Sequence, residues 1–183
     1  TMNIVYFAVN LLAVLLIFHG FLRQSFFGGS FWNFVQALVL GFAMYYAGTW
    51  VLQFALTKLA PGFTIYNNET VGSLISDNEY IMMAVTIILA PVIEETLVRG
   101  LVFGCLKEKS RVAAYVISCV LFAFMHVWTF ALSSWDWSYL ILMLQYLVPG
   151  LVFAWAFDHS GTLWTSILLH ATVNALALWA IVG

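Results

Sequence analysis

The chain has 183 residues, of which 64% are apolar and 8% are charged, and its mean hydropathy is +1.00. Soluble domains carry about 25% charged residues, and a soluble fold of this length could not hide so much apolar surface. The net charge of −2 comes without any basic run, which excludes a nucleic-acid partner. The composition therefore indicates an integral membrane protein.

Six stretches are apolar and long enough to cross a bilayer, which takes about 20 residues. In chain order they cover residues 3–22, 31–58, 79–105, 110–131, 138–157 and 161–182. We expect the first stretch to be retained, because it lacks the basic n-region and clear cleavage site of a signal peptide. The sequence thus predicts an all-α, polytopic membrane helix bundle of about six transmembrane helices, forming one integral membrane domain over residues 1–183.

Basic residues in short loops predict the orientation of such a bundle, because cytoplasmic loops are enriched in lysine and arginine. Arg23, Lys107, Lys109 and Arg111 fall on one side of the predicted membrane, and Lys58 falls on the other. The asymmetry predicts that both termini lie outside. We expect a multi-pass protein of a bacterial plasma membrane.

Several ionisable or strongly polar residues interrupt these apolar stretches. Each costs a few kcal/mol inside hydrocarbon, so each is a hypothesis for function. The alternative for any one of them is a polar contact between helices. The residues are His19 in the first stretch, Glu94, Glu95 and Arg99 in the third, His126 in the fourth, and His170 and Asn174 in the sixth.

Spacing separates the two adjacent glutamates. Glu95 and Arg99 are four residues apart, so they can pair on one face of a helix. Glu94 points about 100° away and has no basic partner on its own helix, which leaves its carboxylate free for chemistry. Pro91 removes a backbone donor one turn earlier and is predicted to kink or loosen the helix before the acidic pair.

The last stretch repeats the four-residue spacing with His170 and Asn174, which therefore project from one face. Such a pair can donate hydrogen bonds to a developing oxyanion, or it can clamp two helices together. Gly100 and Gly104 show the same spacing with small residues, which let another helix approach closely. The pattern favours a polar site shared by three packed helices.

Three motifs carry a resemblance to a known family. Residues 94–99 match EExxxR, residues 122–126 match FxxxH, and residues 170–174 match HxxxN. In this order, in separate apolar stretches, they resemble the CAAX protease and bacteriocin-processing (CPBP, or Abi) family. The resemblance covers a catalytic core of about 79–180. Members usually have about eight membrane segments, whereas this sequence shows six.

The resemblance implies an intramembrane glutamic endopeptidase that cleaves a membrane-associated or lipidated peptide or protein. We expect contacts with membrane lipids and no cofactor or metal ion. The family also includes immunity and regulatory proteins. By resemblance, the water-activating pair is Glu94 and His126, the oxyanion site is His170 and Asn174, and the supporting pair is Glu95 and Arg99.

Other functions remain open on the sequence alone. Two histidines and two glutamates could hold zinc in an intramembrane peptidase, although no His-Glu-x-x-His motif is present. Ser166 precedes His170 by four residues, as a serine nucleophile could, but no Gly-x-Ser-x-Gly elbow occurs. A non-catalytic immunity or regulatory protein, or a transporter with a proton relay, would also bury such groups.

Overall fold

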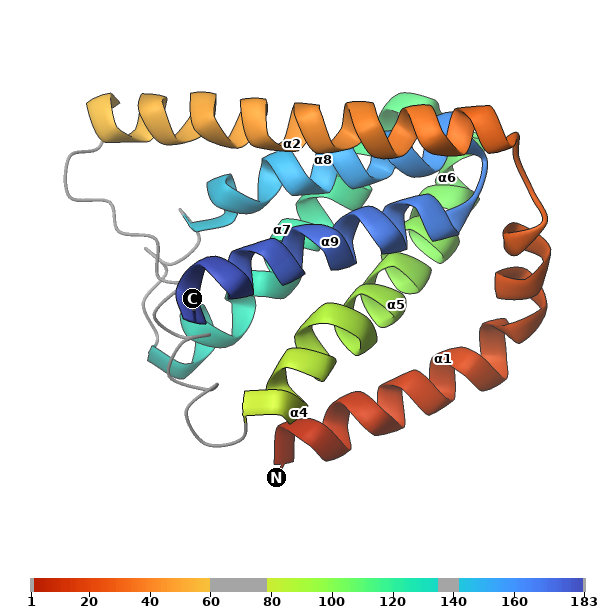
Figure 1. Cartoon of the computed structure of the whole chain (residues 1–183), viewed down its shortest axis with the longest axis horizontal. Coiled ribbons are helices and arrows are strands. Elements are labelled where there is room, and N and C mark those ends of the chain that lie inside the picture. The colour runs from red at the N-terminus through yellow and green to blue at the C-terminus, as the bar shows by residue number, and fades with distance from the viewer. Residues whose placement is uncertain (1, 60–78, 135–141, 183) are drawn as a thin grey trace.

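The computed structural model describes residues 2–59, 79–134 and 142–182, and these ranges are helical and contain no strand (Figure 1). This confirms the predicted all-α bundle. Four helices are long and apolar enough to cross a membrane, and their spans are Val5–Phe26, Phe31–Lys58, Arg111–Trp128 and Leu163–Ala180. The elements in chain order are α1 (Met2–Phe26), α2 (Phe31–Leu59), α4 (Glu79–Ala84), η1 (Val85–Leu89), α5 (Ala90–Glu95), η2 (Thr96–Phe103), α6 (Gly104–Lys107), α7 (Arg111–Ser134), α8 (Met143–Ser160) and α9 (Leu163–Val182).

The third predicted stretch is one long helix built from five consecutive segments, α4, η1, α5, η2 and α6, which we call the composite helix. Two of these segments, η1 and η2, are π-helical, in which a backbone N–H bonds the carbonyl five residues earlier. The acidic pair lies at the end of the short α-helical segment α5, between them. The loosening expected near Pro91 therefore takes the form of π-helical turns on both sides of the acidic pair.

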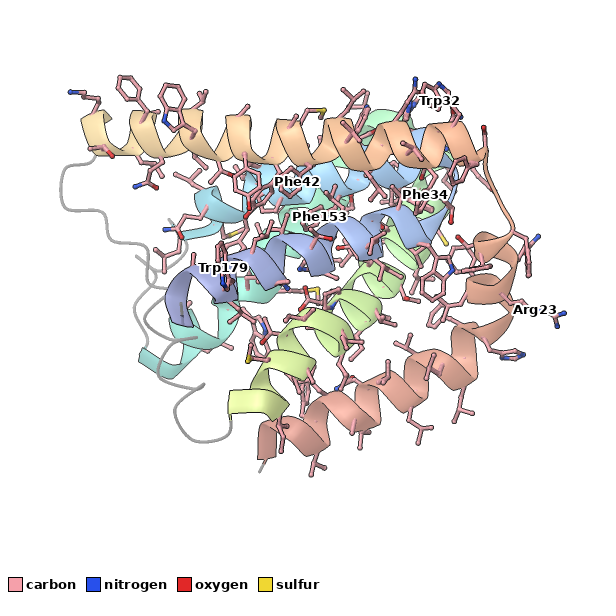
Figure 2. The ribbon with its side chains drawn as sticks, in the orientation of Figure 1. Arg23, Trp32, Phe34, Phe42, Phe153 and Trp179 are labelled. Atoms are coloured by element: carbon pink, nitrogen blue, oxygen red, sulfur yellow. The ribbon has the colours of Figure 1, made fainter. Side chains whose placement is uncertain are left out.

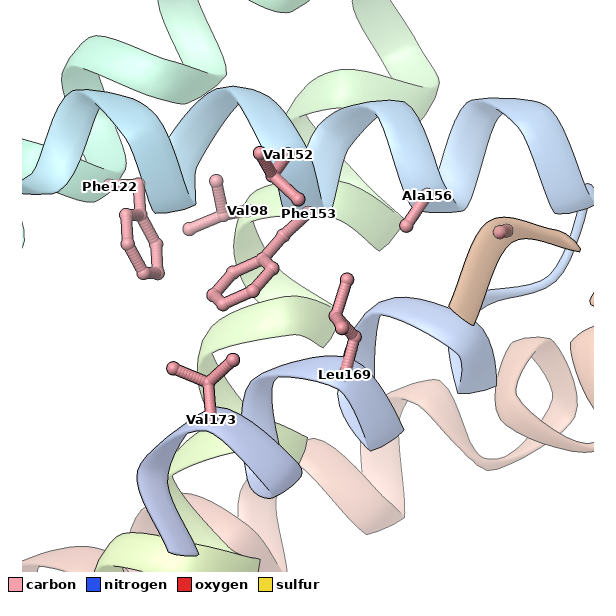
Figure 3. Packing of buried hydrophobic residues seen from close by; sticks show 8 residues of the cluster. Val98, Phe122, Val152, Phe153, Ala156, Leu169 and Val173 are labelled. Carbon is pink, nitrogen blue, oxygen red and sulfur yellow. The ribbon is translucent and has the colours of Figure 1, made fainter. Parts of the chain in front are cut away.

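The core of the bundle forms where five elements meet around α8. Phe153 of α8 packs with Val98 of η2, Phe122 of α7, Leu169 of α9 and Ala37 of α2, and all five are buried (Figure 3). In Figure 1, α2 lies along one side of the molecule and α1 along another, with the composite helix and α9 between them. The polar residues of the composite helix thus face a core supplied by α7, α8 and α9.

The outer faces of α1 and α2 are apolar and exposed. Leu16 and Ile17 are 67% and 71% exposed, and Trp50 and Phe54 on α2 expose most of their surfaces. Figure 2 shows Phe42 of α2 among the side chains on its inner side, whereas Trp32 stands at the outside. Soluble proteins rarely expose continuous apolar faces of this extent, but lipid covers them without cost. The protein is accordingly an integral membrane protein.

Two tight turns meet at the end of the bundle where α1 joins α2. Gly29 and Gly161 both adopt positive φ, which glycine tolerates, and a Cβ on Gly29 would lie 2.2 Å from the Ser160 carbonyl oxygen. Ser25 of α1 accepts a hydrogen bond from the backbone N–H of Leu163 at 2.7 Å. These contacts fasten the α1–α2 turn to the start of α9.

A buried carboxylate fastens the α6–α7 turn to the same end. The Asp158 side chain is 1% exposed and lies 2.5 Å from both Lys107 Nζ and Arg111 Nη2, while Tyr115 donates to it at 2.9 Å. Burial alone would raise the pKa of this carboxyl, but hydrogen bonds from Lys107, Arg111 and Tyr115 outweigh it and hold the pKa below its ordinary value. Two of the basic residues on the predicted cytoplasmic side, Lys107 and Arg111, thus share Asp158 as a structural partner.

We expect Asp158→Asn to lower the free energy of unfolding in detergent by about 1–2 kcal/mol at pH 7, since its cationic partners are partly solvated. Because the folded-state pKa is depressed, the stabilisation is complete above the unfolded-state pKa of about 3.9 and is lost as the pH falls through the lower folded-state value. Thermal unfolding from pH 7 to pH 2 measures this. A difference between the variant and the parent that stays constant over this range would contradict the assignment.

Candidate active site

The proline of the composite helix exposes a backbone acceptor to α9. In η1 the Ala90 N–H bonds the Val85 carbonyl, so the next π-helical bond would join residue 91 to the Thr86 carbonyl. Pro91 has no N–H to give. Asn174 Nδ2 donates to the Thr86 carbonyl at 2.9 Å instead. The asparagine of the HxxxN motif is therefore held by a carbonyl that the helix itself leaves open.

Glu95 is the centre of a fully buried charged network. Its Oε1 lies 3.0 Å from Arg99 Nη1 and 3.0 Å from His170 Nδ1, and the Glu95 and Arg99 side chains are 0% exposed. Arg99 Nη2 also donates to the Gly150 carbonyl of α8 at 2.9 Å. The predicted pairing of Glu95 with Arg99 is confirmed. The network joins the composite helix to α8 and α9 through charge-assisted hydrogen bonds, which are stronger than neutral ones.

Aromatic rings enclose this network. The Arg99 guanidinium lies 4.3 Å from the Phe122 ring centroid and 5.7 Å from that of Phe153. The His170 imidazole stacks on Phe153 at 4.7 Å, and Figure 3 shows Phe122 and Phe153 entering this region from different helices. Cation–π contacts of a desolvated guanidinium stabilise it by about 2 kcal/mol or more. The rings exclude water and offset part of the cost of burying the charge.

Glu94 points away from this network and toward α7. Its Oε2 lies 3.6 Å from His126 Nε2, and the two side chains are 18% and 22% exposed, in contrast to the buried Glu95. Oε2 is itself buried and has no hydrogen-bond donor among the residues that the structure describes. The two adjacent glutamates thus occupy different environments, one sealed in a charged network and one partly exposed.

The hydrogen bonds of His126 define its tautomer. Nδ1 lies 2.8 Å from the Phe122 carbonyl oxygen, which can only accept, so Nδ1 carries the hydrogen. In the neutral ring Nε2 is then an acceptor and faces another acceptor, Glu94 Oε2. The imidazole also stacks on Tyr146 of α8, with centroids 4.4 Å apart and planes at 28°. A molecule with two O–H or N–H groups, placed beside this pair, could donate a hydrogen bond to each acceptor.

The structure gathers the predicted site residues as two neighbouring pairs with their supports. Glu94 meets His126, Glu95 meets His170 and Arg99, and Asn174 is tied to η1. The roles given to these residues by resemblance stay predictions. His19 is not part of this group, because it is exposed on α1 and bonded to its own helix.

The residues of the alternative chemistries are also placed. The Ser166 hydroxyl is fully buried and donates to the Leu163 carbonyl of its own helix at 2.9 Å, which does not suit a nucleophile. Within the described ranges, no three His, Cys, Asp or Glu side chains are arranged to hold a metal ion.

Some participants carried no signal in the sequence. Tyr146 and Phe153 are aromatic residues in an apolar stretch, where aromatic side chains usually serve packing. The Gly150 carbonyl could not have been found either, since backbone acceptors leave no mark in the sequence. Pro91 did signal an open carbonyl, but the sequence did not say which donor would reach it.

Comparison with known proteins identifies relatives of this arrangement. A family model described as "Type II CAAX prenyl endopeptidase Rce1-like" matches residues 76–176, which include all three motifs. "UPF0177 protein YxdF" of Lactococcus lactis subsp. lactis (strain IL1403) is 30% identical over 87 residues, covering 48% of this chain and 42% of that protein. "Putative membrane peptidase YdiL" of Bacillus subtilis (strain 168) is 29% identical over 99 residues, covering 54% of this chain and 36% of that protein. The chain thus spans less than half the length of these relatives, and no solved structure matches it.

We expect Arg99→Met to destabilise the protein by about 3–5 kcal/mol, because it leaves the buried Glu95 carboxylate without its counter-ion. The double variant Glu95→Gln/Arg99→Met should recover much of this loss, since it removes the unpaired charge. Unfolding in detergent measures both. Arg23→Met, which changes an exposed arginine, is the control and should have an effect below about 0.5 kcal/mol. If the effects of Glu95→Gln alone and Arg99→Met alone added up to the effect of the double variant, the two residues would not be a coupled pair.

Proposed function

Because the chain belongs to the type II CAAX prenyl endopeptidase Rce1-like family, we propose that it is an intramembrane endopeptidase. Its reaction is the hydrolysis of a peptide bond in a membrane-associated or lipidated peptide or protein. The observation that carries the proposal is the pair of opposed acceptors, Glu94 Oε2 and His126 Nε2, which lie 3.6 Å apart on two partly exposed side chains of a membrane bundle, with no donor on Oε2 among the described residues. YdiL, the Bacillus relative, bears a name that mentions a membrane peptidase.

In the proposed mechanism a water molecule donates hydrogen bonds to both acceptors. Glu94 takes one proton as the water oxygen attacks the carbonyl carbon of the scissile bond. The carbonyl oxygen becomes an oxyanion. When the C–N bond breaks, the proton passes through His126 to the leaving amine. A positioned acid–base pair of this kind contributes about 10²–10⁴-fold to the rate.

Asn174 and His170 would stabilise the oxyanion. An asparagine amide has two N–H donors, and the bond to the Thr86 carbonyl uses one of them. His170 Nδ1 faces the Glu95 carboxylate, so Nε2 can donate to the oxyanion when the ring holds its second proton. Each donor aimed at an oxyanion is worth about 3–4 kcal/mol.

The substrate would be a peptide or protein that reaches the site from the lipid or from the membrane surface, with membrane lipids as the surrounding partners. Within the described ranges, four helices could span a membrane, and the Glu94–His126 pair lies inside that bundle. In this proposal the Glu94 carboxylate is the base that activates the water, and no cofactor or metal ion is invoked.

We expect purified protein in detergent or liposomes to cleave members of a library of lipidated and unlipidated peptides. Glu94→Gln and His126→Ala should each lower the rate by at least about 100-fold, since each removes a partner in proton transfer. Mass spectrometry identifies the products. Glu108→Gln is the matched control, because Glu108 is an exposed glutamate on the α6–α7 turn.

Three outcomes of this assay would contradict the proposal. Undiminished cleavage by Glu94→Gln would remove the glutamate from the mechanism. Activity that chelation abolishes and zinc restores would favour a zinc-dependent peptidase. No cleavage of any peptide by the parent protein would favour a non-catalytic immunity or regulatory protein that keeps the polar network as structure.

We further propose a bacterial plasma membrane, as both curated relatives are bacterial, with both termini outside. The basic residues Arg23, Lys107, Lys109 and Arg111 lie at the helix ends that meet at the α1–α2 turn, and Figure 2 shows Arg23 pointing outward there. Lys58 lies in the last turn of α2, at the opposite end of the bundle. The positive-inside rule assigns the Lys109 end to the cytoplasm.

In a variant without its native cysteines, Cys105 and Cys119, we expect a membrane-impermeant thiol reagent to label Lys58→Cys in intact cells. Lys109→Cys should be labelled only after the cells are lysed, because the reagent cannot reach the cytoplasm. Mass shift on a gel measures labelling. The reverse pattern would invert the proposed orientation.

A further inference from the structure

Among the residues that the structure describes, two aromatic rings contact the imidazole of His126. Phe122, one turn earlier on α7, has its ring centroid 4.5 Å from that of His126, with planes at 49°. Tyr146, in the first turn of α8, lies at 4.4 Å with planes at 28°, which is a stacked arrangement. Phe122 belongs to the FxxxH motif, whereas Tyr146 lies outside all three motifs. Only Tyr146 approaches the imidazole from another helix.

The position of Tyr146 is itself fixed. Its half-buried side chain packs against the core cluster around Phe153, which also holds the ring of His170. The ring is thus braced by the same packing that braces the oxyanion side of the proposed site. A planar group held in this way limits rotation of the imidazole about its last side-chain bond.

The stacking has a consequence for acid–base chemistry. It keeps Nε2 directed at Glu94 while Nδ1 stays bonded to the Phe122 carbonyl, so the tautomer and the direction of proton transfer are both set.

We propose that Tyr146 is a positioning residue for His126, whose stacked ring orients the imidazole toward Glu94. This inference rests on the proposed function. The ring is the active part of the side chain, and the hydroxyl is not required.

Few charged groups face His126. Among the described residues, those in contact are Glu94 on α5 and Tyr146 on α8. Arg99 on η2 and His170 on α9 contact the ring of Phe122 instead, and both are bonded to Glu95. A change at Tyr146 alone therefore acts on His126 through the stacked ring.

The test compares Tyr146→Leu, which removes the ring, with Tyr146→Phe, which keeps it. Tyr146→Leu should lower kcat about 10–100-fold with little change in KM, because a misdirected imidazole impairs proton transfer after the substrate has bound. Tyr146→Phe should restore kcat to near the parent value.

Tyr45→Leu is the matched control. Tyr45 stacks on Phe153 at 6.3 Å in the same core, and no aromatic contact joins it to a histidine among the described residues. It should lower thermal stability and leave kcat near the parent value. A second readout needs no activity: in protein labelled with ¹⁵N in the histidine rings, the Nδ1 and Nε2 signals of His126, assigned with His126→Gln, should change in Tyr146→Leu only.

Several results would overturn the inference. They are a parent-like kcat with parent-like ring signals in Tyr146→Leu, a Tyr146→Phe variant as impaired as Tyr146→Leu, and the same loss of kcat in Tyr45→Leu. These results differ from failure of the proposed function itself. Glu94→Gln that still cleaves peptides would remove the function, whereas loss of cleavage in Glu94→Gln with no effect at Tyr146 would remove only the positioning role.

Discussion

The buried pair of Glu95 and Arg99 is the constraint on which the rest of this bundle depends. Two charges without water contact are costly unless each meets an opposite charge and further donors or acceptors. Here Glu95 also receives His170, and Arg99 also reaches the Gly150 carbonyl of α8. Satisfying one pair therefore fixes the distances among three helices. The Arg99 contact with the Phe122 ring adds α7 to the same network.

The two adjacent glutamates show how position on a helix places one chemical type in two environments. A rotation of about 100° per residue directs Glu95 into the sealed network and Glu94 toward His126. A carboxylate that already accepts from an arginine and a histidine is a poor base, because taking a proton would break its pairing. Glu94 Oε2 has no such bond among the described residues.

The sequence predicted the parts of this arrangement that follow from spacing along one helix. The four-residue spacing predicted that Glu95 pairs with Arg99, and the apolar stretches predicted the helices. It could not predict contacts between helices, such as that of His170 with Glu95, because these depend on rotation and depth. The stacking of Tyr146 on His126 was hidden for another reason, since an aromatic residue in an apolar helix carries no mark of what its ring will touch.

Backbone carbonyls accept hydrogen bonds from two of the site residues, Asn174 and His126. Asn174 bonds the Thr86 carbonyl, which lacks its π-helical partner because residue 91 is proline, and His126 bonds the carbonyl of Phe122. Both acceptors belong to helices that the core already holds in place. A backbone acceptor cannot change rotamer or take up a proton, so it orients a donor without joining its chemistry. The charged network thus sets the helix positions, and the carbonyls set the directions of the side chains that would meet the substrate.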